Sequence, residues 1–324
     1  MPHRRSSLAG LLFVSVLVYG CAQNTPTPTA SPTLSVQGAT ATPIASANPT
    51  PSSTATAIAA PSGGLPSFSH VWVLVLENAS FGVLAHGAAD PYYRSLIARY
   101  GLAANYFAVA HPSEPNYLAL FSGSTQGVTD DGTHDIAAPN LADQLESHGK
   151  TWHVYEQGYP GGCYAGSSAS GSSEGFGVAG DYARKHDPAI SFNDIRTSPS
   201  RCANITSLTA FDPAAADYEL IVPNTCNDMH SCSEATADAF LASFVPHIIS
   251  SPAFANSALF ITTDEGSGAN QVSTVVISPL VRAGFSSSVR HDHYSLLRTI
   301  EDAWGLGCLG QSCSANNMAE FFGS

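Results

Sequence analysis

Three short segments of this sequence contain apolar residues one after another, without the polar alternation of a half-exposed strand. They are residues 71–76 (VWVLVL), the end of a second run at 220–222 (LIV), and residues 258–262 (ALFIT). Uninterrupted apolar strands are typical of a sheet that is covered on both faces. Residues 151–155 and 273–278 are weaker strand predictions. The chain therefore needs a central sheet with other elements packed on each side.

Helical patterns lie between these strands. One covers residues 139–148, beginning at Asn140 and ending at Gly149, and others cover residues 235–249 and 295–304. Strands that alternate with helices indicate parallel pairing through helical crossovers. We therefore predict an α/β fold with a mostly parallel central sheet and helices on both faces.

Acidic residues follow each of the three main strands. The first strand runs into Glu77 and Asn78, the second leads to Asp228 and His230, and the third ends at Asp264-Glu265-Gly266. In open α/β sheets, ligands bind beyond the carboxyl ends of the strands. One such carboxylate would be an ordinary helix cap, but three in a chain with 11% charged residues favour a binding site. Carboxylate and amide oxygens suit a hard divalent cation.

The segment His111–Tyr117 (HPSEPNY) predicts the start of a helix that continues through Phe121 and ends at Gly123. Ser113 is expected at the N-cap, with Pro115 in the first turn. Free N–H groups and the positive end of the helix dipole make that position suitable for an anion. Alone, this is a capping serine. Beside a divalent metal, which lowers the pKa of a hydroxyl, it would become a nucleophile.

The first 66 residues are expected to lie outside the folded domain. Residues 1–20 combine a basic start with an apolar run and resemble a signal peptide, and Cys21 is placed for the lipid of a bacterial lipoprotein. Ordinary secretion with cleavage nearby is the alternative. Residues 21–66 are rich in Thr, Pro, Ala and Ser, which predicts a disordered tether. Residues 67–324 then form one catalytic domain.

Six cysteines remain if Cys21 carries lipid, and an exported chain favours disulfides. Cys226 with Cys232, and Cys308 with Cys313, are close in sequence, which leaves Cys163 with Cys202. This is our prediction among fifteen possible connectivities.

The formal net charge of −13 argues against nucleic acid or an anionic surface as a broad partner. An anionic substrate would need a local positive centre, which a bound metal would supply.

Six motifs in order resemble the phosphoesterase family of bacterial acid phosphatases and phosphatidylcholine-type phospholipases C, within the alkaline phosphatase-like superfamily. They cover nearly the whole globular part, about residues 68–323. The motifs are ENASF at 77–81, HPSEPNY at 111–117, KHDP at 185–188, DMH at 228–230, DEG at 264–266 and HYSLLRTIED at 293–302.

The resemblance implies one divalent metal ion (Ca, Mg, Mn or Zn) and a covalent phosphoseryl intermediate on Ser113. The implied metal ligands are Glu77, Asn78, Ser113, Asp264 and Glu265. His186, His230 and His293 would bind the phosphate or protonate the leaving group, with Asp228 and Asn116 contacting substrate. In two-metal relatives, the positions of Asp228, His230 and His293 resemble second-site ligands, but the Asp-x-His spacing here is tighter than the usual one. His134 and His153 are assigned structural roles, and only one of His291 and His293 is expected to face the site.

The resulting hypothesis is an exported, metal-dependent phosphoesterase, secreted or anchored through Cys21, that acts on a small phosphate ester. One alternative is a phospholipase C acting on phospholipid head groups, and another is a non-catalytic ligand-binding lipoprotein. A sulfatase is disfavoured because Tyr117 stands where the sulfatase signature has arginine. We expect no nucleic-acid partner, and membrane contact only through the lipid anchor.

Overall fold

The computed structural model describes residues 64–323. The predicted signal peptide, Cys21 and nearly all of the predicted tether lie outside these residues. Within residues 64–323, no helix combines the length and the apolar character that a membrane crossing requires.

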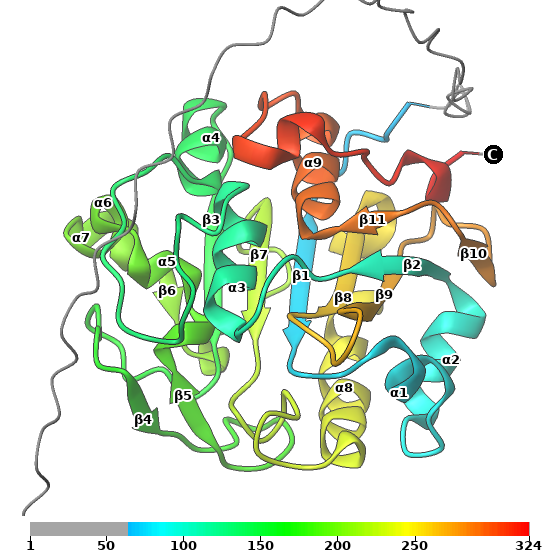
Figure 1. The fold of residues 1–324 in the computed structure, drawn as a ribbon, viewed down its shortest axis with the longest axis horizontal. Coiled ribbons are helices and arrows are strands. Elements are labelled where there is room, and N and C mark those ends of the chain that lie inside the picture. The colour runs from blue at the N-terminus through cyan, green and yellow to red at the C-terminus, as the bar shows by residue number, and fades with distance from the viewer. Residues whose placement is uncertain (1–63, 324) are drawn as a thin grey trace, which may run out of the picture. The chain divides into compact units, whose positions relative to one another are not determined.

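The described chain forms an α/β domain around one large sheet (Figure 1). The strands are β1 (Val71–Leu76), β2 (Gly101–Phe107), β3 (Trp152–Glu156), β4 (Ser168–Ser170), β5 (Asp181–Ala183), β6 (Ile205–Thr206), β7 (Tyr218–Val222), β8 (Ala258–Thr263), β9 (Gln271–Ile277), β10 (Phe285–Ser287) and β11 (His291–Asp292). The α-helices are α1 (Phe81–His86), α2 (Pro91–Arg99), α3 (Ser113–Ser122), α4 (Leu141–Ser147), α5 (Pro188–Ser191), α6 (Asn193–Arg196), α7 (Pro199–Cys202), α8 (Glu234–Ile249) and α9 (His293–Trp304). Short 3₁₀ turns are η1 (Arg184–His186), η2 (Leu208–Ala210), η3 (Pro252–Asn256), η4 (Gly310–Ser314) and η5 (Ala319–Phe321).

The strand order in the large sheet is β10-β2-β9-β8-β1-β7-β3-β6, and β11 also pairs with β2. The sheet is mixed, because β9 runs antiparallel to both β8 and β2, while the other described pairings in this sheet are parallel. The segment from 264 to 270 joins β8 to β9, which is too short for a crossover helix and makes a hairpin. The α/β fold was predicted correctly, and strand β9, which is antiparallel to both of its neighbours, is the exception to parallel pairing.

Helices cover both faces of the sheet, as predicted. Alternate residues of β1 belong to two different apolar clusters. Val71, Val73 and Val75 pack with residues of α3, α4 and α9 on one face. Trp72, Leu74 and Leu76 pack with residues of α1, α2 and α8 on the other. This double burial explains why the strand has no polar alternation.

Helix α3 is buried along its whole length. The residue at its N-cap position is Pro112, which makes no side-chain capping hydrogen bond, and Ser113 is the first helical residue, so the N-cap prediction for Ser113 is wrong. The hydroxyl is therefore free for another partner. The helix ends at Gly123 as predicted, with a left-handed φ of 67°. A Cβ there would lie 1.9 Å from the carbonyl oxygen of Leu309, so only glycine fits.

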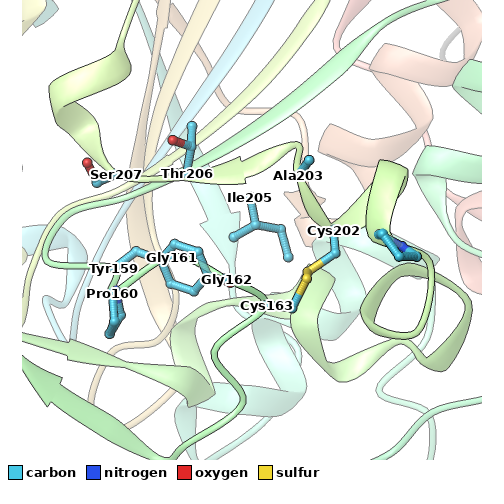
Figure 2. A pocket seen from close by; sticks show the side chains of 11 residues that line it. Tyr159, Pro160, Gly161, Gly162, Cys163, Cys202, Ala203, Ile205, Thr206 and Ser207 are labelled. Atoms are coloured by element: carbon cyan, nitrogen blue, oxygen red, sulfur yellow. A yellow bond between two sulfur atoms is a disulfide. The ribbon is translucent and has the colours of Figure 1, made fainter.

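All three predicted disulfides are present: Cys163–Cys202, Cys226–Cys232 and Cys308–Cys313. The first ties the segment after β3 to α7 and borders a cavity of about 520 Å³ (Figure 2). The residues that line this cavity include Tyr159, Pro160, Ile205 and Thr206, and all of its lining residues are uncharged. It therefore lacks the groups that phosphate chemistry requires.

Candidate active site

The three acidic strand ends meet at one edge of the sheet, as predicted. The backbone N–H of Glu77 donates to the carbonyl oxygen of Asp228 at 2.8 Å. The N–H of Asp264 donates to the carbonyl oxygen of Leu76 at 2.9 Å, and the N–H of Asn78 donates to Asp264 Oδ1 at 3.0 Å. Asn78 has a φ of 51°, a left-handed conformation that asparagine tolerates better than most residues. Glu77, Asp228 and Asp264 are all fully buried.

The carboxylate of Glu77 accepts hydrogen bonds from the candidate nucleophile Ser113 and from two of its neighbours. Ser113 Oγ donates to Glu77 Oε2 at 3.1 Å, and Asn78 Nδ2 donates to the same oxygen at 3.3 Å. The Tyr117 hydroxyl donates to Glu77 Oε1 at 2.6 Å. Tyr117 follows Ser113 by four residues and so lies on the same face of α3. Ser113 is therefore held at the site by a buried carboxylate rather than by its own helix.

His186 lies between two of the strand-end carboxylates. Its Nε2 is 3.2 Å from Glu77 Oε1, and its Nδ1 is 3.3 Å from Asp228 Oδ2. The imidazole stacks on the Tyr117 ring with a centroid separation of 5.2 Å. Burial alone would lower the pKa of His186, but the adjacent carboxylates of Glu77 and Asp228 outweigh it and raise the pKa to about 10. An imidazolium is thus the favoured form in this arrangement.

His230 lies at the rim of the same group. Its backbone N–H donates to Asp228 Oδ1 at 2.7 Å, and its Nε2 is 3.2 Å from the Lys185 ammonium. Burial and the positive charge of Lys185 lower the pKa of His230. Asp228, predicted to contact substrate, in this structure orients His186 and His230.

His293 is fully buried and both of its ring nitrogens have partners. Nε2 is 2.6 Å from the carbonyl oxygen of Asp264, to which it must donate, and Nδ1 is 3.1 Å from the Tyr106 hydroxyl. Burial lowers the pKa of His293 to about 4, so the neutral ring is favoured. His291 instead contacts Glu320 Oε1 at 2.6 Å. The structure therefore places His293 beside Asp264 and turns His291 away, and the contact of His293 with phosphate stays a prediction.

Asn116 fastens the segment that precedes the candidate nucleophile. Its Oδ1 accepts from the N–H groups of Val109 and Ala110, each at 3.0 Å. Its Nδ2 donates to the carbonyl oxygens of Ala110 at 3.0 Å and Pro112 at 3.2 Å. The predicted contact of Asn116 with substrate stays a prediction, because its polar atoms are taken up by the backbone here.

The residues at this edge offer donors that fit a divalent cation. Among residues 64–323, ligand atoms of Glu77, His186 and His230 lie within 4.8 Å of one another. Asp264 Oδ2 is buried and has no hydrogen-bond partner in the described chain. Burial and the neighbouring Glu77 raise the pKa of Asp264 well above its usual value, a cost that a cation would remove.

The predicted ligands Asp264 and Glu265 are outside the group formed by Glu77, His186 and His230. Glu265 is hydrogen-bonded to His111. The ligand set Glu77, Asn78, Ser113, Asp264 and Glu265 therefore stays a prediction.

Sequence reasoning missed four residues at this edge. Tyr117 served only as an argument against a sulfatase, although its four-residue spacing from Ser113 places it in the site. Lys185 precedes His186 in a noted motif, and Asp131 holds its ammonium at 2.9 Å. Glu156 ends β3 in full burial, and burial with Asp187 nearby raises its pKa well above the usual value. No sequence signal identified Asp131, which follows no strand.

The sequence profile of the phosphoesterase family matches residues 69–307. The chain is 34% identical over 267 residues to a phosphatidylinositol-3-phosphatase of Mycobacterium tuberculosis, which covers 81% of this chain and 85% of that protein. It is 28% identical over 264 residues to an acid phosphatase of Aspergillus fumigatus, covering 77% of this chain and 57% of that longer protein.

Two solved structures share the fold at low sequence identity. The protein BT4656, solved with its substrate D-glucosamine-2-N,6-O-disulfate, gives a TM-score of 0.51 at 10% identity, covering 79% of this chain and 80% of that one. The PsFucS1 sulfatase from Pseudoalteromonas sp. gives 0.50 at 10% identity, covering 79% and 72%.

The chain belongs to the phosphoesterase family. It is a hydrolase of phosphate esters, as its acid phosphatase and phosphatidylinositol-3-phosphatase relatives are named. The family resemblance drawn from the sequence is thereby confirmed.

Proposed function

We propose that this protein hydrolyses phosphate monoesters through a covalent phosphoserine on Ser113. One observation carries the proposal: the buried Ser113 Oγ donates to Glu77 Oε2 where three acidic strand ends meet. A structural serine at the start of a helix would cap that helix, but the Ser113 hydroxyl donates to Glu77, outside the helix. Its hydroxyl is directed instead at the residue best placed to bind a metal.

In the first step, Ser113 Oγ bonds to phosphorus and the bond from phosphorus to the alcohol oxygen breaks. Glu77 Oε2 already accepts the hydrogen bond of the attacking hydroxyl and so orients it. The neighbouring His186 outweighs burial and lowers the pKa of Glu77, so the serine proton passes to solvent water rather than to this carboxylate. The positive end of the buried α3 dipole lies at the reacting phosphate. His186 and His230 are proposed to contact phosphate oxygens or to protonate the leaving alcohol. Water then cleaves the phosphoserine, releasing phosphate and restoring Ser113.

A divalent metal is proposed to be held by Glu77, Asn78, Ser113, Asp264 and Glu265, with the group Glu77, His186 and His230 as the alternative. Bound there, it would lower the pKa of the serine hydroxyl and neutralise charge on the phosphoryl group. Asp264 supports the first set through its unpartnered buried oxygen, and His186 supports the alternative through its unpartnered buried Nε2. The orientation of Asp264 is fixed by His293 and Asn78, which we propose as its positioning residues.

The alcohol part of the substrate has a place beside these ligands. A cavity of about 370 Å³ is bordered by Glu77 and Asn78, and its other lining residues are both apolar, such as Val83 and Met229, and polar or acidic, such as Ser233 and Glu234. Its volume fits a small, partly apolar alcohol better than a whole phospholipid. A phospholipase C, or a phosphatidylinositol-3-phosphatase like the mycobacterial relative, would present only a head group here.

The experiment is a substrate panel with metal added back. Metal-free protein receives Mg, Ca, Mn or Zn, then p-nitrophenyl phosphate, bis-p-nitrophenyl phosphate, phosphatidylcholine vesicles or phosphatidylinositol-3-phosphate vesicles. We expect metal-restored turnover that is fastest on the monoester. Preference for phosphatidylcholine would establish a phospholipase C. A metal-loaded protein that is inert toward every ester would favour the non-catalytic binding lipoprotein.

We also propose that the protein is exported and anchored at Cys21. The test is incorporation of radiolabelled palmitate in cells that make the wild-type or the Cys21→Ser protein. Label in the wild type alone is expected. Release of unlabelled wild-type protein into the medium would establish ordinary secretion.

A further inference from the structure

The charge of this protein poses a problem for a phosphate ester, because the chain carries a net −13 and its substrate is also anionic. The sequence contains two lysines, Lys150 and Lys185. Both are ion-paired with an aspartate, but only Lys185 lies beside the candidate active site. The two residues therefore provide an internal comparison between a functional and a structural ammonium.

Lys185 lies in η1, directly before His186. Its Nζ donates to Asp131 Oδ2 at 2.9 Å and lies 3.2 Å from His230 Nε2. Since His186 and His230 each have a ligand atom within 4.8 Å of one on Glu77, the ammonium borders the acidic edge where Ser113 is held. The Lys185 side chain is 20% exposed, so it is open to solvent.

Asp131 links this ammonium to the helix of the nucleophile. Its Oδ1 accepts from the backbone N–H of Glu114 at 3.0 Å, one residue after Ser113, while its Oδ2 accepts from Lys185. The Glu114 side chain is itself held by His134 Nδ1 at 2.9 Å and Ser191 Oγ at 3.2 Å. One carboxylate thus fixes both the first turn of α3 and the position of the ammonium.

An ammonium has three N–H donors. Asp131 and His230 account for two of them, and the third is available to an additional acceptor. We propose that Lys185 binds a non-bridging oxygen of the substrate phosphate, with Asp131 as its positioning residue. This inference rests on the proposed function and adds to it a positive centre supplied by the chain itself.

Lys150 shows what a structural lysine looks like in the same protein. Its Nζ donates to Asp217 Oδ1 at 2.8 Å and lies 4.9 Å from the centroid of the Trp304 ring. Asp217 also accepts from the backbone N–H of Thr151, at the amino end of the sheet. The pair resembles Lys185–Asp131 in distance and exposure but has no site residue beside it, which makes Lys150→Met a matched control.

The test compares Lys185→Met, Lys185→Arg and Lys150→Met in the full chain. The readouts are kcat and KM for p-nitrophenyl phosphate, the inhibition constant of inorganic phosphate, and the thermal midpoint. A charge-assisted hydrogen bond is worth about 10- to 100-fold in binding. We expect Lys185→Met to raise KM and the phosphate inhibition constant by about that factor, Lys185→Arg to recover part of the loss, and Lys150→Met to change neither more than about twofold. Unchanged phosphate inhibition in folded Lys185→Met, or an equal loss in Lys150→Met, would overturn the proposal.

Asp131→Asn tests the positioning role, because asparagine keeps an acceptor for the Glu114 N–H but lacks the charge. If Asp131 acts through Lys185, the double variant Lys185→Met/Asp131→Asn will bind phosphate no more weakly than Lys185→Met alone. Additive losses would show that Asp131 only supports the fold. Should Lys185→Met fail to fold, Lys185→Gln carries the same comparison. An inactive wild type would reject the proposed function, whereas an active wild type with normal Lys185 variants rejects only this inference.

Discussion

The two ends of the central sheet bury acidic side chains in different surroundings. Helix α9 finishes at the amino end, where Trp304 Nε1 donates to the carbonyl oxygen of Phe68. There, Glu301 accepts hydrogen bonds from the Leu309 N–H at 2.8 Å and from Ser312 Oγ at 2.6 Å. At the carboxyl end, Asp264 accepts from a backbone N–H through one oxygen, and its other oxygen has no partner among residues 64–323.

The difference teaches that a buried carboxylate does not by itself mark a site. Glu301 closes a loop, because donors from that loop satisfy both of its oxygens. Glu77 and Asp264 instead face other ionisable groups, and those groups belong to strands and helices far apart in sequence. Glu219, in the first half of β7, is also buried with one oxygen that has no partner among residues 64–323, so an open acceptor is not by itself the distinction. The carboxyl end of the sheet differs from the amino end because its buried carboxylates flank the His186 imidazole.

The largest expected effect belongs to Ser113→Ala. Loss of the attacking oxygen is expected to lower kcat by about 10³-fold or more, with little change in the thermal midpoint. Steady-state kinetics on p-nitrophenyl phosphate check this, together with intact-mass detection of phosphorylated protein. Ser122→Ala, at the opposite end of the same helix, is the control and should stay active. Full activity in Ser113→Ala would reject the nucleophile assignment.

Replacing one aspartate at each end of the sheet by asparagine tests directly whether only the carboxyl end binds metal. Asp264→Asn is expected to lose bound metal in elemental analysis and to lower kcat/KM at least about 100-fold, because a charged ligand is removed. Asp217→Asn at the amino end should keep the bound metal and the wild-type kcat/KM. It should lower the free energy of unfolding by no more than about 1 kcal/mol, as for a partly exposed ion pair. Equal metal content in the two variants would contradict the ligand set.

The smallest expected effect is a pH dependence of the free energy of unfolding, caused by Glu301 at the amino end of the sheet. Burial raises the pKa of Glu301 from an ordinary 4.5 to about 7, so the folded state favours the protonated form. Its stabilising contribution is complete below about pH 4.5 and is lost as the pH rises toward 7.

Glu301→Gln should remove that part of the pH dependence in urea unfolding, and cost about 1 kcal/mol at pH 5 through a lost acceptor. An unchanged pH slope in this variant would show that Glu301 titrates normally. Turnover at fixed pH should not change.

Much of the carboxyl end was predictable because its strands are buried on both faces. Residues 71–76 and 258–262 are apolar throughout most of their length, so the acids that follow them stand out. The strand Gly101–Phe107 was missed, because its glycine and asparagine obscure the apolar pattern. The antiparallel direction of β9 could not be read from its own residues, since apolar content carries no strand direction. Lys185 and Asp131 meet only through tertiary contacts between two segments 54 residues apart.

Helix α3 is about 15 Å long and runs from the carboxyl end of the sheet toward its amino end. Ser113 lies at the N-terminal end of this helix. At the C-terminal end, Gly123 packs against the carbonyl of Leu309 with no room for a Cβ, and its own carbonyl oxygen accepts a hydrogen bond from the Gln311 N–H at 2.7 Å. A fully packed helix moves as a rigid unit, so contacts at its C-terminal end help to fix its position along its axis. The depth of the serine hydroxyl in the site is therefore set, in part, by the hydrogen bond between Gly123 and Gln311 at the other end of the helix.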